Sequence, residues 1–268
     1  QSGALTITGA TTLVTSANDA TITLGTTTNA FTGALTITTN DASGTDADVT
    51  IDGGTTALII AASTIDGDLT LTSGNASGIT DSGDVTVGGN FAATTDANAG
   101  VINMGTLKVD GTIALTTDST GAATVVNDAA LTFAASTVGG ALTATATTGD
   151  ITDSGTLTIT GAAIFKTSVD GSNIVLDSSS NAFSAAVTMI ADAGGEDFGN
   201  ITFVDSAAID FATSASSNGD FYINSSTDGT VGGNLSVTAT TGNITDTVAL
   251  AVAGTTTLVT SADNATIV

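Results

Sequence analysis

Carboxylates are the side chains of this sequence whose number and spacing could support chemistry. The chain has 26 acidic residues, two basic residues, no His and no Cys. Hard cations such as Ca²⁺ are held by several carboxylate and carbonyl oxygens. The two densest acidic segments supply six candidate ligands, which are Asp41, Asp46, Asp48, Asp192, Glu196 and Asp197. Calcium is therefore the candidate ion for these residues, while solvated turns that hold no specific ion are the favoured interpretation.

Neither acidic segment has the spacing of an EF-hand or of the nonapeptide that binds calcium in β-rolls. General base catalysis would have to use carboxylates, because the chain contains no His or Cys. A cleft that binds a sugar acid would also need basic and aromatic side chains, and the chain has only two Lys, one Tyr and no Trp. We therefore predict that the protein is not an enzyme and that it has no cofactor other than the candidate calcium.

Net charge limits the partners of the chain. Its formal charge is −24 at pH 7. Binding to nucleic acid depends on Lys and Arg that neutralise phosphates, and anionic lipid also repels an acidic surface. No apolar run reaches the length that spans a membrane. We expect no nucleic-acid partner and no membrane insertion.

The residues around the acidic turns alternate between apolar and hydroxyl side chains. Leu5-Thr6-Ile7-Thr8, Leu69-Thr70-Leu71-Thr72 and Leu157-Thr158-Ile159 are examples. A period of two in β-branched residues is typical of short, half-buried strands. Gly, Asn, Asp and Ser interrupt these segments about every ten residues, as turns do. The sequence therefore predicts an all-β protein.

The chain repeats itself at two periods. Residues 3–8 recur without change at 33–38, and residues 138–153 recur in close copy at 231–246. The shorter period is about 30 residues and the longer about 93 residues, and a fixed period of tens of residues is typical of solenoids. Three coils of about 31 residues would make one longer repeat, so we expect roughly nine coils of about 30 residues. Leu5 would then stack on Leu35, and Thr6 on Thr36.

We predict one continuous solenoid over residues 1–268. Its longer repeat has approximate copies at 1–64, 65–137, 138–230 and 231–268. The alternative is a series of immunoglobulin-like sandwiches, since about 93 residues also fits one such domain. The shorter period argues against sandwiches, because their strands are not copies of one another. The chain starts at Gln1 and ends in a strand-like segment, from which we expect a mature product or a window of a longer repeat protein.

Four segments carry a resemblance to a known family: Asn29–Thr36, Gly139–Gly155, Asn181–Thr188 and Gly232–Asp246. Their repeating pattern resembles that of the filamentous-haemagglutinin-like adhesins and related giant β-strand-repeat exoproteins of bacteria. The resemblance implies a right-handed parallel β-helix, secretion across the envelope and a role as a fibre or adhesin shaft.

From these features we predict a structural fibre or adhesin shaft on a bacterial cell surface, located outside the cell. Its partners would be further copies of itself, in end-to-end or lateral association, and the cell surface or extracellular matrix. Stacked strands would make a stiff rod without disulfides, and acidic turns would keep that rod soluble. An exposed strand edge at each end would accept another strand.

A ligand-recognising solenoid is the alternative function. Thr side chains arranged in regular rows on one flat face could bind ice or a glycan. The candidates are Thr6, Thr8, Thr36, Thr38, Thr70 and Thr72. Thr also simply favours strands. The Phe residues are interpreted as core, because Phe31 and Phe183 occupy equivalent repeat positions; the aromatic group at 195–225 is where a neighbour would bind if any aromatic patch does so.

Overall fold

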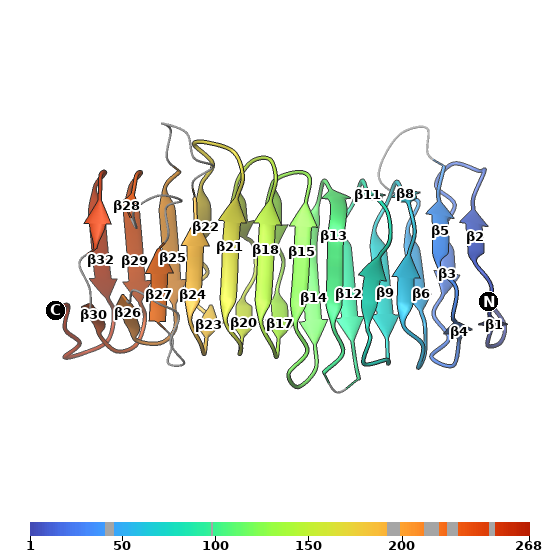
Figure 1. The fold of residues 1–268 in the computed structure, drawn as a ribbon, viewed down its shortest axis with the longest axis horizontal. Coiled ribbons are helices and arrows are strands. Elements are labelled where there is room, and N and C mark those ends of the chain that lie inside the picture. The colour runs from blue at the N-terminus through green and yellow to red at the C-terminus, as the bar shows by residue number, and fades with distance from the viewer. Residues whose placement is uncertain (41–45, 98, 192–198, 212–219, 224–229, 247–249) are drawn as a thin grey trace. The chain divides into compact units, whose positions relative to one another are not determined.

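The computed structural model describes residues 1–40, 46–97, 99–191, 199–211, 220–223, 230–246 and 250–268, and the side chains of 220–223 and 230 are not included. The described chain is built from strands and turns, and it contains no helix. It divides into two compact units, the first formed by 1–129 and 138–140 and the second by 130–137 and 141–268. Figure 1 labels most of the strands of both units.

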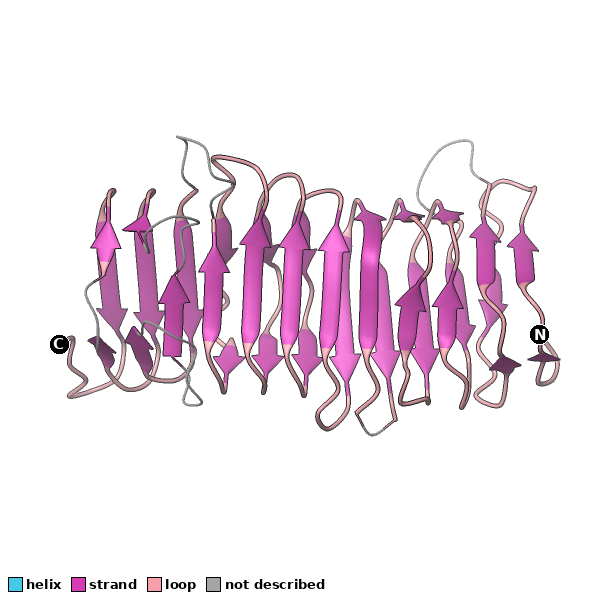
Figure 2. Cartoon of the chain, viewed as in Figure 1, coloured by secondary structure: helices cyan, strands magenta, loops and turns pink. Residues whose placement is uncertain are grey.

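Two parallel sheets, here named sheet I and sheet II, make up the first unit (Figure 2). Sheet I contains β2 (Thr11–Val14), β5 (Leu35–Thr38), β7 (Leu58–Ile60), β8 (Ser63–Ile65), β10 (Ile79–Asp81), β11 (Val85–Val87), β13 (Ile102–Val109) and β15 (Ala123–Asn127). Sheet II contains β3 (Ile22–Leu24), β6 (Val49–Asp52), β9 (Leu69–Ser73), β12 (Phe91–Thr95) and β14 (Thr112–Thr117). A separate short pair joins β1 (Thr6–Ile7) to β4 (Ala30–Phe31).

The second unit repeats this arrangement. Its sheet I contains β18 (Leu142–Ala146), β21 (Ala163–Thr167), β24 (Val187–Ile190), β26 (Ile209–Phe211), β27 (Asp220–Ile223) and β30 (Ile244–Asp246). Its sheet II contains β16 (Leu131–Phe133), β19 (Ile151–Asp153), β22 (Ile174–Leu176), β25 (Ile201–Asp205), β29 (Leu235–Ala239) and β32 (Thr256–Thr260). Shorter strands are β17 (Ser136–Val138), β20 (Leu157–Ile159), β23 (Ala182–Phe183), β28 (Thr230–Val231) and β31 (Ala251–Val252).

Alternation decides which side chains enter the core. Leu69, Leu71 and Ser73 of β9 point inward and are buried, while Thr70 and Thr72 between them are half-buried and point outward. Each winding stacks its strands on the winding before it at about 4.8 Å, so like positions form ladders. Leu69 pairs with Phe91, and Leu71 pairs with Ala93. Burial of these continuous apolar ladders stabilises each unit by about 25 cal/mol per Å² of apolar surface.

The prediction of an all-β parallel β-solenoid is confirmed, because the strand pairs of both units run parallel and link successive windings. The predicted winding length is wrong, because the windings are shorter and more numerous than the repeats indicate. Across the described residues there are about 10 windings at a spacing of about 22 residues. In the first unit Leu69 pairs with Phe91, and in the second unit Leu142 pairs with Ala163.

The predicted ladder partners are wrong for the same reason. Leu35 pairs with Thr11 and Ile60 rather than with Leu5, and Thr6 pairs with Ala30 rather than with Thr36. The identical copies at 3–8 and 33–38 thus occupy different sides of the winding: Thr6-Ile7 lie in β1, and Leu35–Thr38 form β5 of sheet I. The shorter sequence repeat therefore spans one winding plus one further short strand.

The longer repeat also changes sides within the second unit. In the copy at 138–153, Leu142–Ala146 form β18 in sheet I. In the copy at 231–246, Leu235–Ala239 form β29 in sheet II. The Ile-Thr-Asp segments that follow change in the opposite sense, from β19 in sheet II to β30 in sheet I. Alternating strands of similar length fit either sheet, so identity of sequence does not determine the side of the solenoid.

Candidate functional site

The described calcium candidates lie in an exposed turn. Asp46 and Asp48 are both exposed. Oδ1 of Asp48 accepts a hydrogen bond from the backbone N–H of Asp68 at 2.8 Å. Asp41, Asp192, Glu196 and Asp197 lie outside the described residues. Among the residues that the structure does describe, no group of three or more acidic side chains is placed to hold a metal ion, so calcium binding stays a prediction.

Asp48 instead belongs to a ladder of side chains, which we name the corner ladder. Each Asp or Asn of the ladder stands directly before a strand of sheet II, and its Oδ1 accepts the backbone N–H of the equivalent residue in the next winding; a Thr ends the ladder as a donor only. In the first unit the ladder runs from Asp48 through Asp68 and Asn90 to Thr112, with N–O distances of 2.8, 2.6 and 2.9 Å. These bonds satisfy N–H groups at the turn into each strand, where a winding leaves the regular sheet.

The corner ladder of the second unit is longer by one step. It starts at Asp150 and continues through Asn173, Asn200 and Asn234 to Thr255, with N–O distances of 2.7, 2.9, 2.9 and 2.8 Å. The amide of Asn200 also donates to Oδ1 of Asn173 at 2.9 Å. A net hydrogen bond of this kind contributes about 0.5–1.5 kcal/mol. The ladder therefore fixes the corner of the winding and the register of sheet II.

Two buried asparagines perform a similar role at another turn. Asn29 and Asn181 are 1 % and 0 % exposed. Oδ1 of Asn29 accepts the N–H of Leu5 at 2.9 Å, and Oδ1 of Asn181 accepts the N–H of Leu157 at 2.8 Å. Their buried amides are satisfied as well, since Asn181 donates to Oδ2 of Asp153 at 2.6 Å. A buried polar side chain is tolerated when each of its groups has a partner.

Asp205 is a carboxyl group inside the second unit. It is 2 % exposed and ends β25 on the inward side, where its neighbour in β29 is Ala239. Its Oδ1 accepts the N–H groups of Phe183 and Ala207, each at 3.3 Å. Desolvation by burial raises the pKa of Asp205 to about 6, and hydrogen bonds from the backbone of Phe183, Ala207 and Ser206 oppose that shift.

Hydroxyl groups fill the corresponding inward position in the first unit. Ser73, Thr95 and Thr117 end β9, β12 and β14 and are buried. Each donates its hydroxyl hydrogen to a backbone carbonyl, as Thr95 does to Gly100 at 2.9 Å. An ionised carboxylate has no hydrogen to donate, whereas a protonated carboxyl group has one. Asp205 therefore places a titrating group at a position that the other unit fills with groups that do not titrate near neutral pH.

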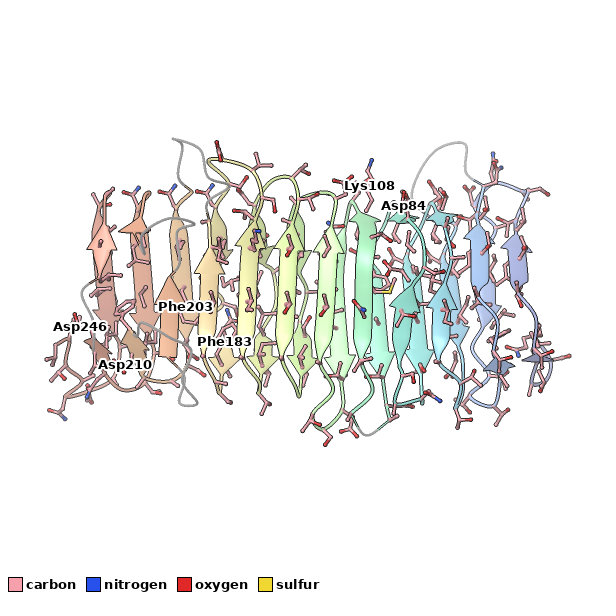
Figure 3. All side chains as sticks on the ribbon, viewed as in Figure 1. Asp84, Lys108, Phe183, Phe203, Asp210 and Asp246 are labelled. Atoms are coloured by element: carbon pink, nitrogen blue, oxygen red, sulfur yellow. The ribbon has the colours of Figure 1, made fainter. Side chains whose placement is uncertain are left out.

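Phe side chains form part of the core, as the sequence predicts. Phe31 and Phe183 are 1 % and 5 % exposed. In the second unit Phe133 packs edge-on against Phe165, with ring centroids 6.0 Å apart, and Phe165 packs edge-on against Phe183 at 6.1 Å. The ring centroids of Phe183 and Phe203 lie 5.2 Å apart. Figure 3 labels this pair. Such contacts contribute about 0.5–1.5 kcal/mol each beyond the buried area.

The aromatic group predicted at 195–225 divides in the structure. Phe203 and Phe211 are 1 % and 3 % exposed and belong to the core. Phe198 lies outside the described residues, and Phe221 and Tyr222 are described in their backbone only. The two described side chains are therefore packed inside the second unit and not presented to a neighbour.

Outward side chains of sheet II form uninterrupted rows, which we name the sheet II face. In the second unit one row passes through Thr132, Thr152, Val175, Thr202, Ser236 and Thr257. A shorter row beside it passes through Val204, Thr238 and Val259. None of these side chains carries a charge, although the chain as a whole has a charge of −24.

The first unit carries the same kind of face. One row passes through Thr23, Thr50, Thr70, Ala92 and Ala114, and the second passes through Asp52, Thr72, Thr94 and Thr116. Asp52 is the single charge in these two rows, and its Oδ1 accepts the N–H of Gly54 at 2.7 Å. The predicted Thr70 and Thr72 lie on this face, whereas Thr36 and Thr38 lie in β5 of sheet I.

Comparison with known protein families matches the chain to the family described as repeats of unknown function (DUF5649). The match covers residues 1–38, 46–106, 120–190 and 198–268, which is most of the chain. The chain belongs to this family. No curated protein and no solved structure is detectably similar to it. Membership confirms a repeat protein, and it does not extend to the filamentous-haemagglutinin-like adhesins.

Sequence reasoning missed the two polar features of these DUF5649 repeats. The corner ladder has a sequence signal, because an Asp or Asn precedes an alternating apolar segment in successive windings, as in Asp68-Leu69 and Asn90-Phe91. Asp205 has a signal too, since it continues the inward positions of Ile201 and Phe203. No helix in the described part of the chain is long and apolar enough to cross a membrane.

Proposed function

We propose that this DUF5649 chain is a shaft segment of an extracellular fibre or adhesin on a bacterial surface. The observation that carries the proposal is the parallel, in-register stacking of winding upon winding within each unit. Each added winding extends a sheet by about 4.8 Å and repeats the contacts of the one before. Such an architecture suits a structural role, because windings can be added to lengthen the solenoid while the packing of the core stays the same.

Placement of the charges also supports an exposed structural role. Most of the described acidic side chains lie at turns and strand ends, and Asp96, Asp118 and Asp177 are exposed examples. Exposed carboxylates of this kind are solvated, and their mutual repulsion opposes precipitation of a strand-rich protein. Copies of the chain itself, end to end or side by side, and the cell surface or extracellular matrix are the partners that fit this arrangement.

Immunogold electron microscopy of native cells tests the proposal. Antibodies raised against this chain should label thin filaments outside the cell, and cells that lack the protein should show no label. Repeating the experiment with a chelator tests whether calcium supports the filaments. Label confined to the cell interior, or label on discrete short particles, would oppose a shaft.

A ligand-binding solenoid with an ice- or glycan-binding Thr face is the second candidate. The observation in its favour is the group of Thr70, Thr72, Thr94 and Thr116 on the sheet II face. Ala92 and Ala114 interrupt one of the rows, which leaves the hydroxyl array incomplete. Microscopy of ice crystals grown in the protein solution separates the two candidates, because a shaft leaves their growth habit unchanged.

A further inference from the structure

We infer that residues 205–208, the turn after β25 that we name the clasp, form a pH-sensitive switch, which is closed while the Asp205 carboxyl group is protonated and opens more readily when that group is ionised. Figure 1 labels β25 and β26, the strands that the clasp joins. Asp205 is 2 % exposed, whereas Ala207 and Ala208 are exposed. The buried carboxyl group thus lies only two residues from the surface, and a small movement of the turn brings water to it.

The closed clasp is bonded to the windings on both sides of it. Oδ1 of Asp205 accepts the N–H of Phe183 in the preceding winding at 3.3 Å. The N–H of Ser206 donates to the carbonyl oxygen of Asn181 in the same winding at 2.7 Å. The N–H of Thr240 in the following winding donates to the carbonyl oxygen of Asp205 at 2.8 Å. Opening of the clasp therefore loosens the contact between three successive windings.

The first unit contains the same turn with a neutral side chain in place of the carboxyl group. Residues 29–31, Asn-Ala-Phe, recur as residues 181–183. The N–H of Phe31 donates to Oγ1 of Thr56 at 3.0 Å, and that hydroxyl group donates in turn to a backbone carbonyl oxygen at 2.7 Å. Thr56 is both acceptor and donor, whereas an ionised Asp205 is an acceptor only. Protonation of Asp205 gives it the hydrogen that the Thr56 hydroxyl group already has.

No basic side chain balances an ionised Asp205. The bonded and paired segments 177–183, 206–211 and 235–240 contain no Lys, and Lys166, the one Lys of the unit, is exposed on the outward side of β21. Neither β24 nor β29 carries a titratable side chain. The charged residues on the segments around Asp205 are all acidic: Asp153, Asp177, Asp210 and Asp220. A desolvated carboxylate without a cation is unfavourable, and burial accordingly raises the pKa of Asp205 to about 6.

Opening of the clasp is coupled to the release of one proton. The buried carboxyl group binds its proton more tightly than a solvated carboxyl group with the ordinary pKa of 3.8, so closing takes up a proton from solvent and opening returns it. The equilibrium constant for opening is lowest below about pH 4, increases up to about pH 6 and is constant at higher pH. The two pKa values correspond to an increase on the order of 50-fold between pH 4 and pH 7. Acid therefore locks the clasp, and neutral pH loosens it.

Amide hydrogen exchange of the whole chain, followed by NMR between pH 4 and pH 7, tests the inference. Protection factors remove the effect of pH on the chemistry of exchange. The N–H groups of Phe183, Ser206 and Ala207 should lose protection on the order of 50-fold over this range. Two other N–H groups serve as references and should keep their protection: that of Phe31, which is bonded to a hydroxyl group, and that of Ile174 in β22, which is bonded to the carbonyl oxygen of Asn200 at 3.0 Å.

A pair of matched variants assigns the effect to one side chain. Asp205→Asn keeps an acceptor for the N–H of Phe183 and cannot ionise, so protection of Phe183 should be the same at both ends of the pH range. Asp177→Asn is the control, because it removes one exposed carboxylate from the adjacent segment and changes the net charge equally. Its exchange should depend on pH as that of the unchanged protein does.

Protection of Phe183 and Ser206 that stays constant between pH 4 and pH 7 overturns the inference. So does an equal loss at Phe31, which would show a general effect on such turns, or at Ile174, which would show opening of the whole unit. A pH dependence that persists in Asp205→Asn or vanishes in Asp177→Asn assigns the effect to another group and also overturns the inference. The profile of the unchanged protein is decisive even if a variant fails to fold. None of these outcomes bears on the shaft function, which the immunogold experiment tests separately.

Discussion

Single polar side chains, more than apolar ones, distinguish one position of this solenoid from another. Most inward positions hold Leu, Ile, Val, Ala or Phe, and each contributes mainly by its buried area. Asn29, Asn181 and Asp205 are buried as well, and each is bound to backbone N–H groups of neighbouring segments. An unsatisfied group at these positions would cost about 1–3 kcal/mol. Asn29 and Asn181 therefore help to fix register, and Asp205 makes the stability depend on pH.

Asp205→Asn should remove a pH-dependent loss of stability. The folded-state pKa of about 6 lies above the ordinary value of 3.8, so the folded chain binds an extra proton between these values. Its contribution to stability is fully present below about pH 4, declines as pH rises through 6, and is then constant. Asn keeps an acceptor for Phe183 and Ala207 and carries no charge. We expect the variant to be more stable near pH 8 by an amount on the order of 2 kcal/mol, with little difference near pH 4.

Urea denaturation of the variant and the unchanged protein at both pH values measures this difference. Comparing the two proteins at each pH cancels the titration of the other carboxyl groups. Asp110→Asn is the matched control, because Asp110 is exposed. A gain that is the same at both pH values would contradict a role for the ionised Asp205 carboxylate.

Asn200→Ala should break the corner ladder of the second unit at its centre. The change leaves the N–H of Asn234 without the acceptor that now lies at 2.9 Å, and it also removes the amide bond to Asn173. We expect a loss of about 1–2 kcal/mol in the free energy of unfolding. Asn200→Asp keeps the acceptor and should lose less, since the ladder of the first unit already uses Asp48 and Asp68 in this way. Equal losses in both variants would show that the amide, and not the acceptor, supports the turn.

Among the elements of the fold, the strands could be predicted from the sequence, whereas the turns that set the winding length could not. The alternating pattern predicts the existence of the strands and their inward faces, as β9 and β12 show. The winding length could not be predicted from the repeats, because Leu142–Ala146 and Leu235–Ala239 are close copies that lie in different sheets. Side-chain alternation fixes which face is buried, and turn geometry fixes where the chain returns.

The candidate site could be predicted only in part, for a physical reason. Carboxylates at turns are visible in the sequence, yet whether Asp48 holds an ion or a backbone N–H depends on the winding that stacks beside it. The uncharged rows of the sheet II face likewise require the true spacing, since Thr202 and Ser236 pair in space although a long stretch of chain separates them. Long-range register was the missing information in both cases.

Gly78→Ala should disrupt a turn of the first unit. Gly78 has a φ of +64°, and a Cβ there would come within 1.7 Å of the carbonyl oxygen of Val101 in the next winding. That oxygen is also the acceptor for the N–H of Ile79. Strain at φ above zero and displacement of the neighbouring winding together should cost at least about 2 kcal/mol. Thermal denaturation followed by circular dichroism measures the effect.

Gly105→Ala provides the comparison for that experiment. An added Cβ at Gly105 meets only Oδ1 of Asp81, at 3.9 Å, so the change should be tolerated. A Gly78→Ala protein with an unchanged melting temperature would mean that the windings can separate locally at no cost. The close approach of successive turns would then have no part in holding the solenoid together.

Charge dominates the behaviour of the molecule as a whole. With 26 acidic residues and two lysines, repulsion between the acidic turns lowers the stability of the folded chain. Salt shortens the range of this repulsion to about 10 Å at 0.1 M, so the melting temperature should rise with ionic strength. Asp110→Asn, Asp118→Asn and Asp263→Asn together remove three exposed charges and should raise the melting temperature at low salt while reducing the further gain from added salt.

Asn103→Asp is the opposite change, because it adds a charge at an exposed position of β13. It should lower the melting temperature at low salt and increase the gain from added salt. Calorimetry over a series of sodium chloride concentrations compares both variants with the unchanged protein. Parallel curves would show that the acidic turns act as independent solvated groups, and repulsion between them would then have no part in the stability of the folded chain.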